Sequence, residues 1–185
     1  MSHEIYLNIH CAAPNDIPAA FPHHASLTEF TEKHPSRLCV GSDGSDVYEK
    51  LEHAVAELGL APLSWLNWEA ASEKIGDGEI DEIFIKRIDS NAIVELGKAA
   101  DAMIAAAIAN PHSLIVISTQ FDEEEAEDIA RAASEAPLDM TEDDLSYYDL
   151  GESWDHFFYF LYLLREICRE SRTSGKGMIL AWTFS

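Results

Sequence analysis

The sequence predicts an α/β fold built on one central sheet, mixed or mainly parallel, of about five strands flanked by helices, with an extra helical layer near the C-terminus. Two observations lead to this prediction. Strand-like and helix-like stretches alternate along most of the chain, and LIVIST, 114–119, is a short apolar run typical of a strand buried on both faces of a parallel sheet. A length of 185 residues suits one large domain, so residues 1–185 are expected to form a single α/β domain.

The N-terminal part is expected to contain two strands and a helix. EIYLNIHCA, 4–12, has the apolar pattern of a first strand. Ser26 followed by Glu29 has the spacing of a capping box, which predicts a short helix that ends by Pro35. SRLCVGS, 36–42, then predicts the second strand.

The next part is expected to form two helices and a strand. One helical face is predicted by the spacing of Val47, Leu51, Ala54, Val55 and Leu58. Gly59 supplies the left-handed residue that ends this helix. Pro62 is well placed to start a second helix that runs to Gly76. Residues 79–88 contain β-branched and aromatic residues and are predicted to be a strand rather than a helix.

The second half of the chain is mainly helical. A helix is predicted from Ser90 or Asn91 to Asn110, and a second over 122–136, where carboxylates crowd the first turn. A short acidic helix from Thr141, a long helix from about residue 152 to residue 172, and a last strand at 178–184 follow.

No motif in the sequence names a reaction. GSDGSD, 41–46, lacks the GxGxxG spacing and has no Walker lysine, so it is interpreted as a turn. None of the eight histidines has the spacing of a metal site. Cys11, Cys39 and Cys168 are far apart and odd in number, which favours reduced thiols, with Cys39 as a core residue of its strand rather than a nucleophile. We therefore predict no catalytic residue, no cofactor and no metal.

The sequence also bears on location. The N-terminus, MSHEIYLNIH, lacks the basic start and apolar run of a secretory signal. The apolar run FFYFLYLL, 157–164, is far shorter than the ~20 residues that span a bilayer. A cytoplasmic protein without membrane contact is expected.

Charge is the most unusual property of the chain. Asp and Glu number 34 against 12 Lys and Arg, a formal net charge of −22. Such a protein repels nucleic acid and anionic membranes and attracts basic proteins, with association that is fast and sensitive to salt. Adaptation to a saline habitat is a competing explanation, but the charge is local. Residues 121–155 carry 14 acids and a single base, Arg131, whereas an adapted surface would spread its charge more evenly.

Aromatic residues accompany this acidic stretch, and the pairing favours a protein interface over a merely solvated face. Charge would guide the approach of a partner and aromatic area would prolong its residence. The predicted partner-binding residues are Asp122, Glu123, Glu124, Glu125, Asp139, Glu142, Asp143, Asp144, Tyr147, Tyr148, Asp149, Glu152, Trp154 and Asp155.

The long C-terminal helix is apolar almost all round, which predicts that its middle is buried. At most three aromatic residues of this helix would then be available to a partner: Trp154, Tyr159 and Tyr162. The negative end of the helix dipole favours cations, so the arginines at the far end of this helix need no nucleic acid to explain them: Arg165, Arg169 and Arg172.

In size, acidity, cytosolic character and lack of a catalytic motif, the chain resembles the immunity proteins of bacterial contact-dependent growth inhibition and other polymorphic toxin systems. The resemblance lies in DEEEAED, TEDDLSYYD and ESWD. It implies an inhibitor that binds a basic protein, such as a cognate nuclease toxin, and occludes its active or nucleic-acid-binding surface without covalent chemistry.

Two other functions are compatible with the sequence. A small α/β enzyme would place its site at the carboxyl ends of the strands, around Gly41–Asp46 and Thr119–Asp122. A regulatory module would use the acidic face for docking. Charge reversal in the acidic stretch would weaken partner binding by an inhibitor or a docking module, but it would leave the turnover of an enzyme unchanged.

Overall fold

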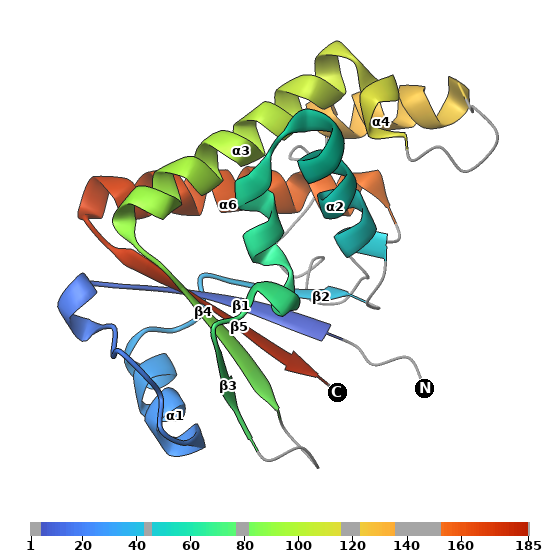
Figure 1. Cartoon of the computed structure of the whole chain (residues 1–185). Coiled ribbons are helices and arrows are strands. Elements are labelled where there is room, and N and C mark those ends of the chain that lie inside the picture. Colours follow the sequence, from blue (N-terminus) through green and yellow to red (C-terminus); the bar gives the residue numbers. More distant parts are fainter. Residues whose placement is uncertain (1–4, 43–45, 77–81, 116–122, 136–152, 185) are drawn as a thin grey trace.

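The computed structural model describes residues 5–42, 46–76, 82–115, 123–135 and 153–184. A five-stranded sheet with the order β2-β1-β5-β4-β3 forms its centre (Figure 1). Its strands are β1 (Ile5–Ala12), β2 (Leu38–Ser42), β3 (Glu73–Ile75), β4 (Ile83–Ile88) and β5 (Gly177–Phe184).

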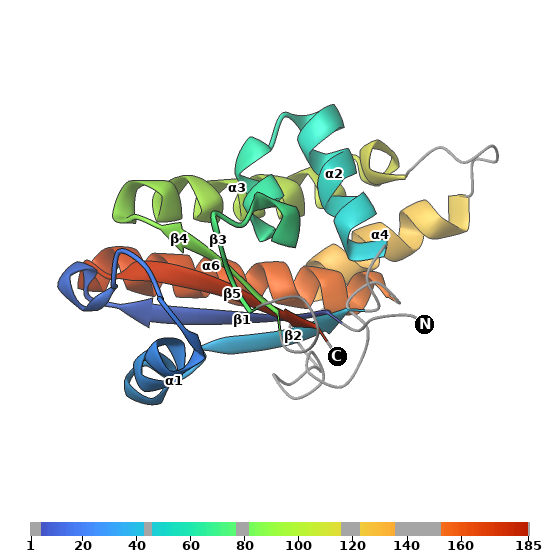
Figure 2. The same ribbon diagram turned by 60° about the horizontal axis from the view of Figure 1, so that its bottom comes forward.

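Helices cover the sheet unequally. The α-helices are α1 (His24–Lys33), α2 (Asp46–Leu58), α3 (Ser90–Ala109), α4 (Glu123–Glu135) and α6 (Trp154–Ser174). Short 3-10 turns are η1 (Pro14–Asp16), η2 (Ala61–Leu66), η3 (Trp68–Ala70) and η4 (Pro111–Leu114). Figure 2 shows α1 alone on one side of the sheet and the other α-helices on the opposite side. Among the described helices, none is both long enough and apolar enough to cross a membrane.

The predicted mixed or mainly parallel sheet is wrong, because every strand pair of the described sheet is antiparallel. The first and last strands, β1 and β5, lie side by side over their full length, from Ile5 opposite Phe184 to Ala12 opposite Gly177. Alternating strands and helices therefore do not form βαβ crossovers in this chain.

The path of the chain between β4 and β5 explains the antiparallel order. α3 leaves the end of β4, and α6 runs back beside α3 in the opposite direction, since Gly97 lies against Cys168 and Asp101 pairs with Arg165. The chain thus re-enters the sheet at the end that it left, and Ile88 pairs with Met178. A parallel neighbour would require a crossover to the other end of the sheet.

The predicted helix from Pro62 to Gly76 is also wrong. The segment forms the turns η2 and η3 and then β3. At Asn67 the backbone is extended, and the Asn67 side chain accepts a hydrogen bond from the Glu69 N–H, so the helical path ends there. Trp68 packs edge-on against Phe84 and Phe184, which holds the turns on the sheet.

Two further predictions differ from the structure. The strand predicted at 114–119 does not begin at Leu114, because Leu114 is the last residue of the turn η4. Residues 116–119 lie outside the described residues. The capping box of α1 lies three residues earlier than predicted. The Ser26 N–H donates to His23 Nδ1 at 3.2 Å, so His23 is the N-cap and Ser26 occupies the position predicted for Glu29.

Most helix predictions are confirmed. Gly59 follows α2 with a φ of 67°, and Asp89 caps α3 by accepting hydrogen bonds from two N–H groups. α4 and α6 lie where the sequence predicts them, and α6 ends at Gly175 in the left-handed conformation. The predicted short helix from Thr141 lies outside the described residues.

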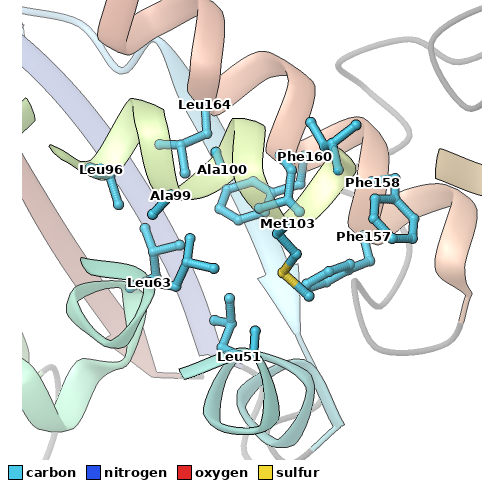
Figure 3. Close-up of a cluster of buried hydrophobic side chains, with 14 of the residues drawn as sticks. Leu51, Leu63, Leu96, Ala99, Ala100, Met103, Phe157, Phe158, Phe160 and Leu164 are labelled. Atoms are coloured by element: carbon cyan, nitrogen blue, oxygen red, sulfur yellow. The ribbon is translucent and has the colours of Figure 1, made fainter. Parts of the chain in front are cut away.

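The main core lies between the sheet and the helices α2, α3, α4 and α6. Phe157, Phe158 and Phe160 of α6 and Met103 of α3 are almost completely buried in it (Figure 3). Complete burial of one such side chain stabilises the fold by about 1.5–3 kcal/mol. A smaller cluster around Phe21, Phe30 and Ile179 holds α1 on the other face.

α3 and α6 approach each other most closely at Gly97, where an added Cβ atom would lie 3.0 Å from Cys168 Cβ. We expect Gly97→Ala to reduce the free energy of unfolding by about 1 kcal/mol, because overpacking at this contact exceeds the gain in helix propensity. Chemical denaturation measures the change. Ala102→Gly, at an exposed position of the same helix, reports the propensity difference alone. If Gly97→Ala raised the free energy of unfolding by as much as Ala102→Gly lowers it, the close contact at Gly97 would be contradicted.

Candidate interaction surface

Of the fourteen predicted partner-binding residues, the structure describes five: Glu123, Glu124, Glu125, Trp154 and Asp155. The other nine lie outside the described residues: Asp122, Asp139, Glu142, Asp143, Asp144, Tyr147, Tyr148, Asp149 and Glu152. The described part of the acidic stretch is therefore α4 and the first turn of α6.

α4 has one narrow buried face. Ala126, Ile129, Ala132 and Ala133 are buried, and α4 lies against both α3 and α6. Every other residue of α4 is exposed or half-exposed. The small alanines let the helix sit close to its neighbours, which fixes its orientation without requiring large apolar side chains.

The solvent side of α4 is almost wholly anionic. We call this set the acidic surface of α4: Glu123, Glu124, Glu125, Glu127, Asp128 and Glu135. The three acids of the first turn are favoured by the positive end of the helix dipole, which offsets part of their mutual repulsion. Glu127, Asp128 and Glu135 were not among the predicted partner-binding residues, although helical spacing from Ala126 and Ile129 places them on the side facing solvent.

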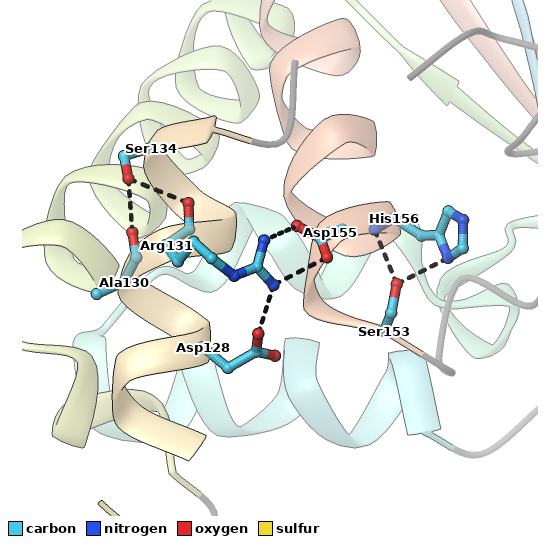
Figure 4. Close-up of polar contacts among 7 residues, drawn as sticks. All are labelled: Asp128, Ala130, Arg131, Ser134, Ser153, Asp155 and His156. Carbon is cyan, nitrogen blue, oxygen red and sulfur yellow. Dashed lines mark hydrogen bonds and ion pairs between the residues drawn. The ribbon is translucent and has the colours of Figure 1, made fainter. Parts of the chain in front are cut away.

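Arg131, the one cation of α4, forms intramolecular ion pairs (Figure 4). Its guanidinium donates to both carboxylate oxygens of Asp155, at 2.9 and 3.0 Å, and also to Asp128. These two acids raise the pKa of Arg131 above its ordinary value. The pair with Asp155 joins α4 to the first turn of α6, so Asp155 has a structural partner and the charge of Arg131 is neutralised locally.

Trp154 lies in the core rather than on the surface. Only 9% of it is exposed, and its ring stacks on Phe158 with the ring centroids 5.8 Å apart. The Lys50 ammonium of α2 lies 4.9 Å from the centroid of the Trp154 ring, a cation–π contact that connects α2 to α6. Trp154 therefore supplies anchoring area to the fold, and little of its surface faces a partner.

The two tyrosines of α6 also make internal contacts. Tyr159 is 9% exposed. Tyr162 donates a hydrogen bond from its hydroxyl to the Ala133 carbonyl at 2.8 Å, which fastens α4 to α6. The described surface of this region is consequently carboxylate-rich and poor in aromatic area.

The alternative enzyme site was expected where the carboxyl ends of parallel strands converge, and the described sheet is antiparallel. In an antiparallel sheet the carboxyl ends of neighbouring strands lie at opposite ends of the sheet, so they do not converge on one cleft. Gly41 is a buried residue of β2, and Thr119–Asp122 lie outside the described residues. Burial raises the pKa of the Cys39 thiol, which keeps it protonated rather than nucleophilic. Among the described His, Cys, Asp and Glu residues, no three are grouped so that they could hold a metal ion.

A hollow of about 350 Å³ lies between α1 and the sheet. Its polar lining includes Asn8, His10, His24, Thr28 and Thr183. His10 is 5% exposed, its Nδ1–H donates to the His34 carbonyl at 2.8 Å, and burial is the main cause that lowers its pKa. The imidazole of His10 is therefore neutral near pH 7.

The Arg131–Asp155 pair can be tested by a double-mutant cycle. We expect a coupling free energy of about 0.5–1 kcal/mol between Arg131→Gln and Asp155→Asn, because the pair is bidentate but partly exposed. Urea denaturation of the four proteins measures this coupling, which should shrink in 1 M NaCl as salt screens the pair. A coupling of zero at low salt would show that the pair does not hold α4 to α6.

His10 predicts a specific pH dependence of stability. Its pKa in the folded protein lies below the ordinary value of 6.5, so the unfolded chain binds the proton more tightly. The stabilisation from neutral His10 is present above pH 6.5 and is lost as the pH falls through the folded pKa. The wild type should therefore lose more stability than His10→Gln between pH 7.5 and pH 5, measured by urea denaturation. Equal losses in both proteins would contradict this assignment.

Comparison of the chain with protein-family models, with curated proteins and with solved structures found no match. The functional argument therefore depends on the residues of this chain alone. Its strongest feature is the acidic surface of α4, carried by a helix whose only cation is paired within the molecule.

Proposed function

We propose that this chain is an inhibitor of immunity type, which acts in the cytoplasm by binding a basic protein through the acidic surface of α4 and covering that protein's active or nucleic-acid-binding surface. A cognate nuclease toxin fits this role, because the groove of a nuclease carries Lys and Arg residues for phosphates. The carboxylates of the inhibitor would occupy the places of those phosphates.

One observation carries the proposal. The acidic surface of α4 presents six carboxylates along a 13-residue helix, and Glu123, Glu125 and Glu127 form no ion pair with any described residue. Asp128, in contrast, pairs with Arg131, which also pairs with Asp155.

Rigid support strengthens the argument. α4 is held by its buried alanine face, by the hydrogen bond from Tyr162 and by the Arg131 pair with Asp155. Carboxylates on a fixed helix are already arranged before a partner arrives, so less side-chain and backbone freedom is lost on binding. A net charge of −22 adds long-range attraction for a basic protein and raises the association rate.

The remaining features agree with a cytoplasmic binding protein. Cys11, Cys39 and Cys168 are all free thiols, and the pKa of each is raised mainly by burial. Thiols of this kind contribute to packing and do not require an oxidising compartment.

The test uses two triple variants with the same change in net charge. The first, Glu123→Gln/Glu125→Gln/Glu127→Gln, neutralises the acidic surface of α4. The second, Asp16→Asn/Glu29→Gln/Glu32→Gln, neutralises three exposed acids of η1 and α1 on the other side of the sheet. Each variant and the wild type are used to capture proteins from the native host at low salt, and association rates are then measured with the captured basic protein.

We expect the α4 variant to associate about tenfold more slowly than the wild type at low salt, and the control variant to differ little. The difference should diminish at high salt. Equal rates for both variants would contradict the assignment to α4. An enzymatic activity of the captured protein should be lost in the complex; full activity there would favour a regulatory docking module instead.

A further inference from the structure

The strongest remaining feature is a hollow of about 340 Å³ between the first half of α3 and the second half of α6. Its floor is apolar and is formed by Ile93, Val94, Gly97 and Cys168. Because Gly97 has no side chain, the two helices approach closely at the floor and the longer side chains around it stand up as a rim.

The rim is strongly cationic. Lys98, Arg165, Arg169 and Arg172 all line the hollow, and Asp101 is its only acidic lining residue. Four of nine lining residues are thus basic, in a chain in which only 12 of 185 residues are Lys or Arg. Composition alone does not account for such a concentration.

The helix dipole explains only part of this rim. Arg172 lies in the last turn of α6, where a cation is favoured, but the effect fades beyond one turn. Arg165 lies more than two turns before the end of α6, and Lys98 lies in the first half of α3, where the dipole does not favour a cation. The cations therefore converge because α3 and α6 run antiparallel.

The existing ion pairs of the rim are weak and replaceable. Arg165 reaches Asp101 at 3.2 Å and Glu166 at 3.3 Å. Lys98 reaches Glu95 at 2.9 Å, and Arg169 also pairs with Glu166. Partly exposed pairs of this kind contribute little, so a ligand oxyanion can displace them. Arg172 is exposed and makes no ion pair with any described residue.

We infer that this hollow binds a small organic dianion of the phosphate-monoester class. The planar guanidinium groups of the three arginines match phosphate oxygens in pairs, and Lys98 adds a fourth positive charge. The organic part of the ligand packs on Ile93 and Val94. A volume of about 340 Å³ lies within the range of small-molecule sites.

The floor supports binding rather than reaction. Burial raises the pKa of the Cys168 thiol to about 12, so it stays protonated and contributes apolar surface. Nucleic acid is excluded as the occupant, because a long polyanion meets the full charge of −22, whereas a small ligand within the hollow senses mainly the nearby cations.

This inference is independent of the proposed function. The hollow and the acidic surface of α4 share no residue, because the hollow is lined only by residues of α3 and of the second half of α6. A failure at one surface therefore leaves the other untouched.

The test is calorimetric titration of the full chain with phenyl phosphate at pH 7.5, where the probe is a dianion. Inorganic phosphate and benzoate serve as comparison ligands. We expect saturable one-to-one binding with a Kd of about 1 mM or lower, weaker binding of inorganic phosphate because it lacks an apolar part, and weaker binding of benzoate because it carries one charge.

Two matched pairs of variants locate the site. Arg172→Gln should weaken phenyl phosphate binding about tenfold, while Lys33→Gln, the same charge change on α1, should alter it less than about twofold. Asp101→Asn should strengthen binding about threefold, while Glu29→Gln, its match on α1, should not.

Several results would overturn the inference. These are no saturable binding of phenyl phosphate up to about 10 mM, equal weakening by Arg172→Gln and Lys33→Gln, or benzoate binding as tightly as phenyl phosphate. Amide shifts in NMR confined to Val94, Gly97 and Lys98 and their neighbours on α6 would support it, and shifts elsewhere alone would contradict it.

Discussion

The close antiparallel packing of α3 on α6 is the contact on which the rest of the structure depends. At Gly97 the two helices are so close that an added Cβ atom would lie 3.0 Å from Cys168 Cβ. Their opposed directions return the chain to the end of the sheet that it left, which makes β4 and β5 antiparallel and places β5 at the centre. The same helix pair buries the phenylalanines of α6 and supports the alanine face of α4.

This packing also separates the charges of the molecule. Acidic side chains gather on α4, and basic side chains gather around the hollow between α3 and the second half of α6. Arg131 bridges the acidic helices without leaving a free positive charge on their surface. A surface for a basic macromolecule and a hollow for a small anion can thus coexist on one strongly anionic chain, because screening limits each charge to its neighbourhood.

Local signals in the sequence predict the individual helices well and their assembly poorly. The spacing of Leu51, Ala54 and Leu58 with Gly59 after them is enough to place α2, since each residue acts within one or two turns. The direction of the strands depends on how α3 and α6 pair, and no local pattern contains that. The helix predicted after Pro62 is wrong for a related reason, because contacts of Trp68 with Phe84 and Phe184 override a helix-like apolar spacing. At the candidate surface, the acidic run predicts the exposed glutamates of α4, but the burial of Trp154 and the pairing of Asp155 are tertiary facts. The cationic rim is hidden for the same reason, because Lys98 and Arg172 come together only in the fold.

The central claim, that the acidic surface of α4 is where a basic partner docks, is tested most directly by carboxyl footprinting of the complex. Carbodiimide labelling read by mass spectrometry compares each carboxylate in the free chain and in the chain bound to its basic partner. The account predicts that Glu123, Glu125 and Glu127 become protected while Glu29 and Glu32 on α1 label equally in both states. Unchanged labelling of the α4 glutamates, with protection elsewhere on the molecule, would contradict it.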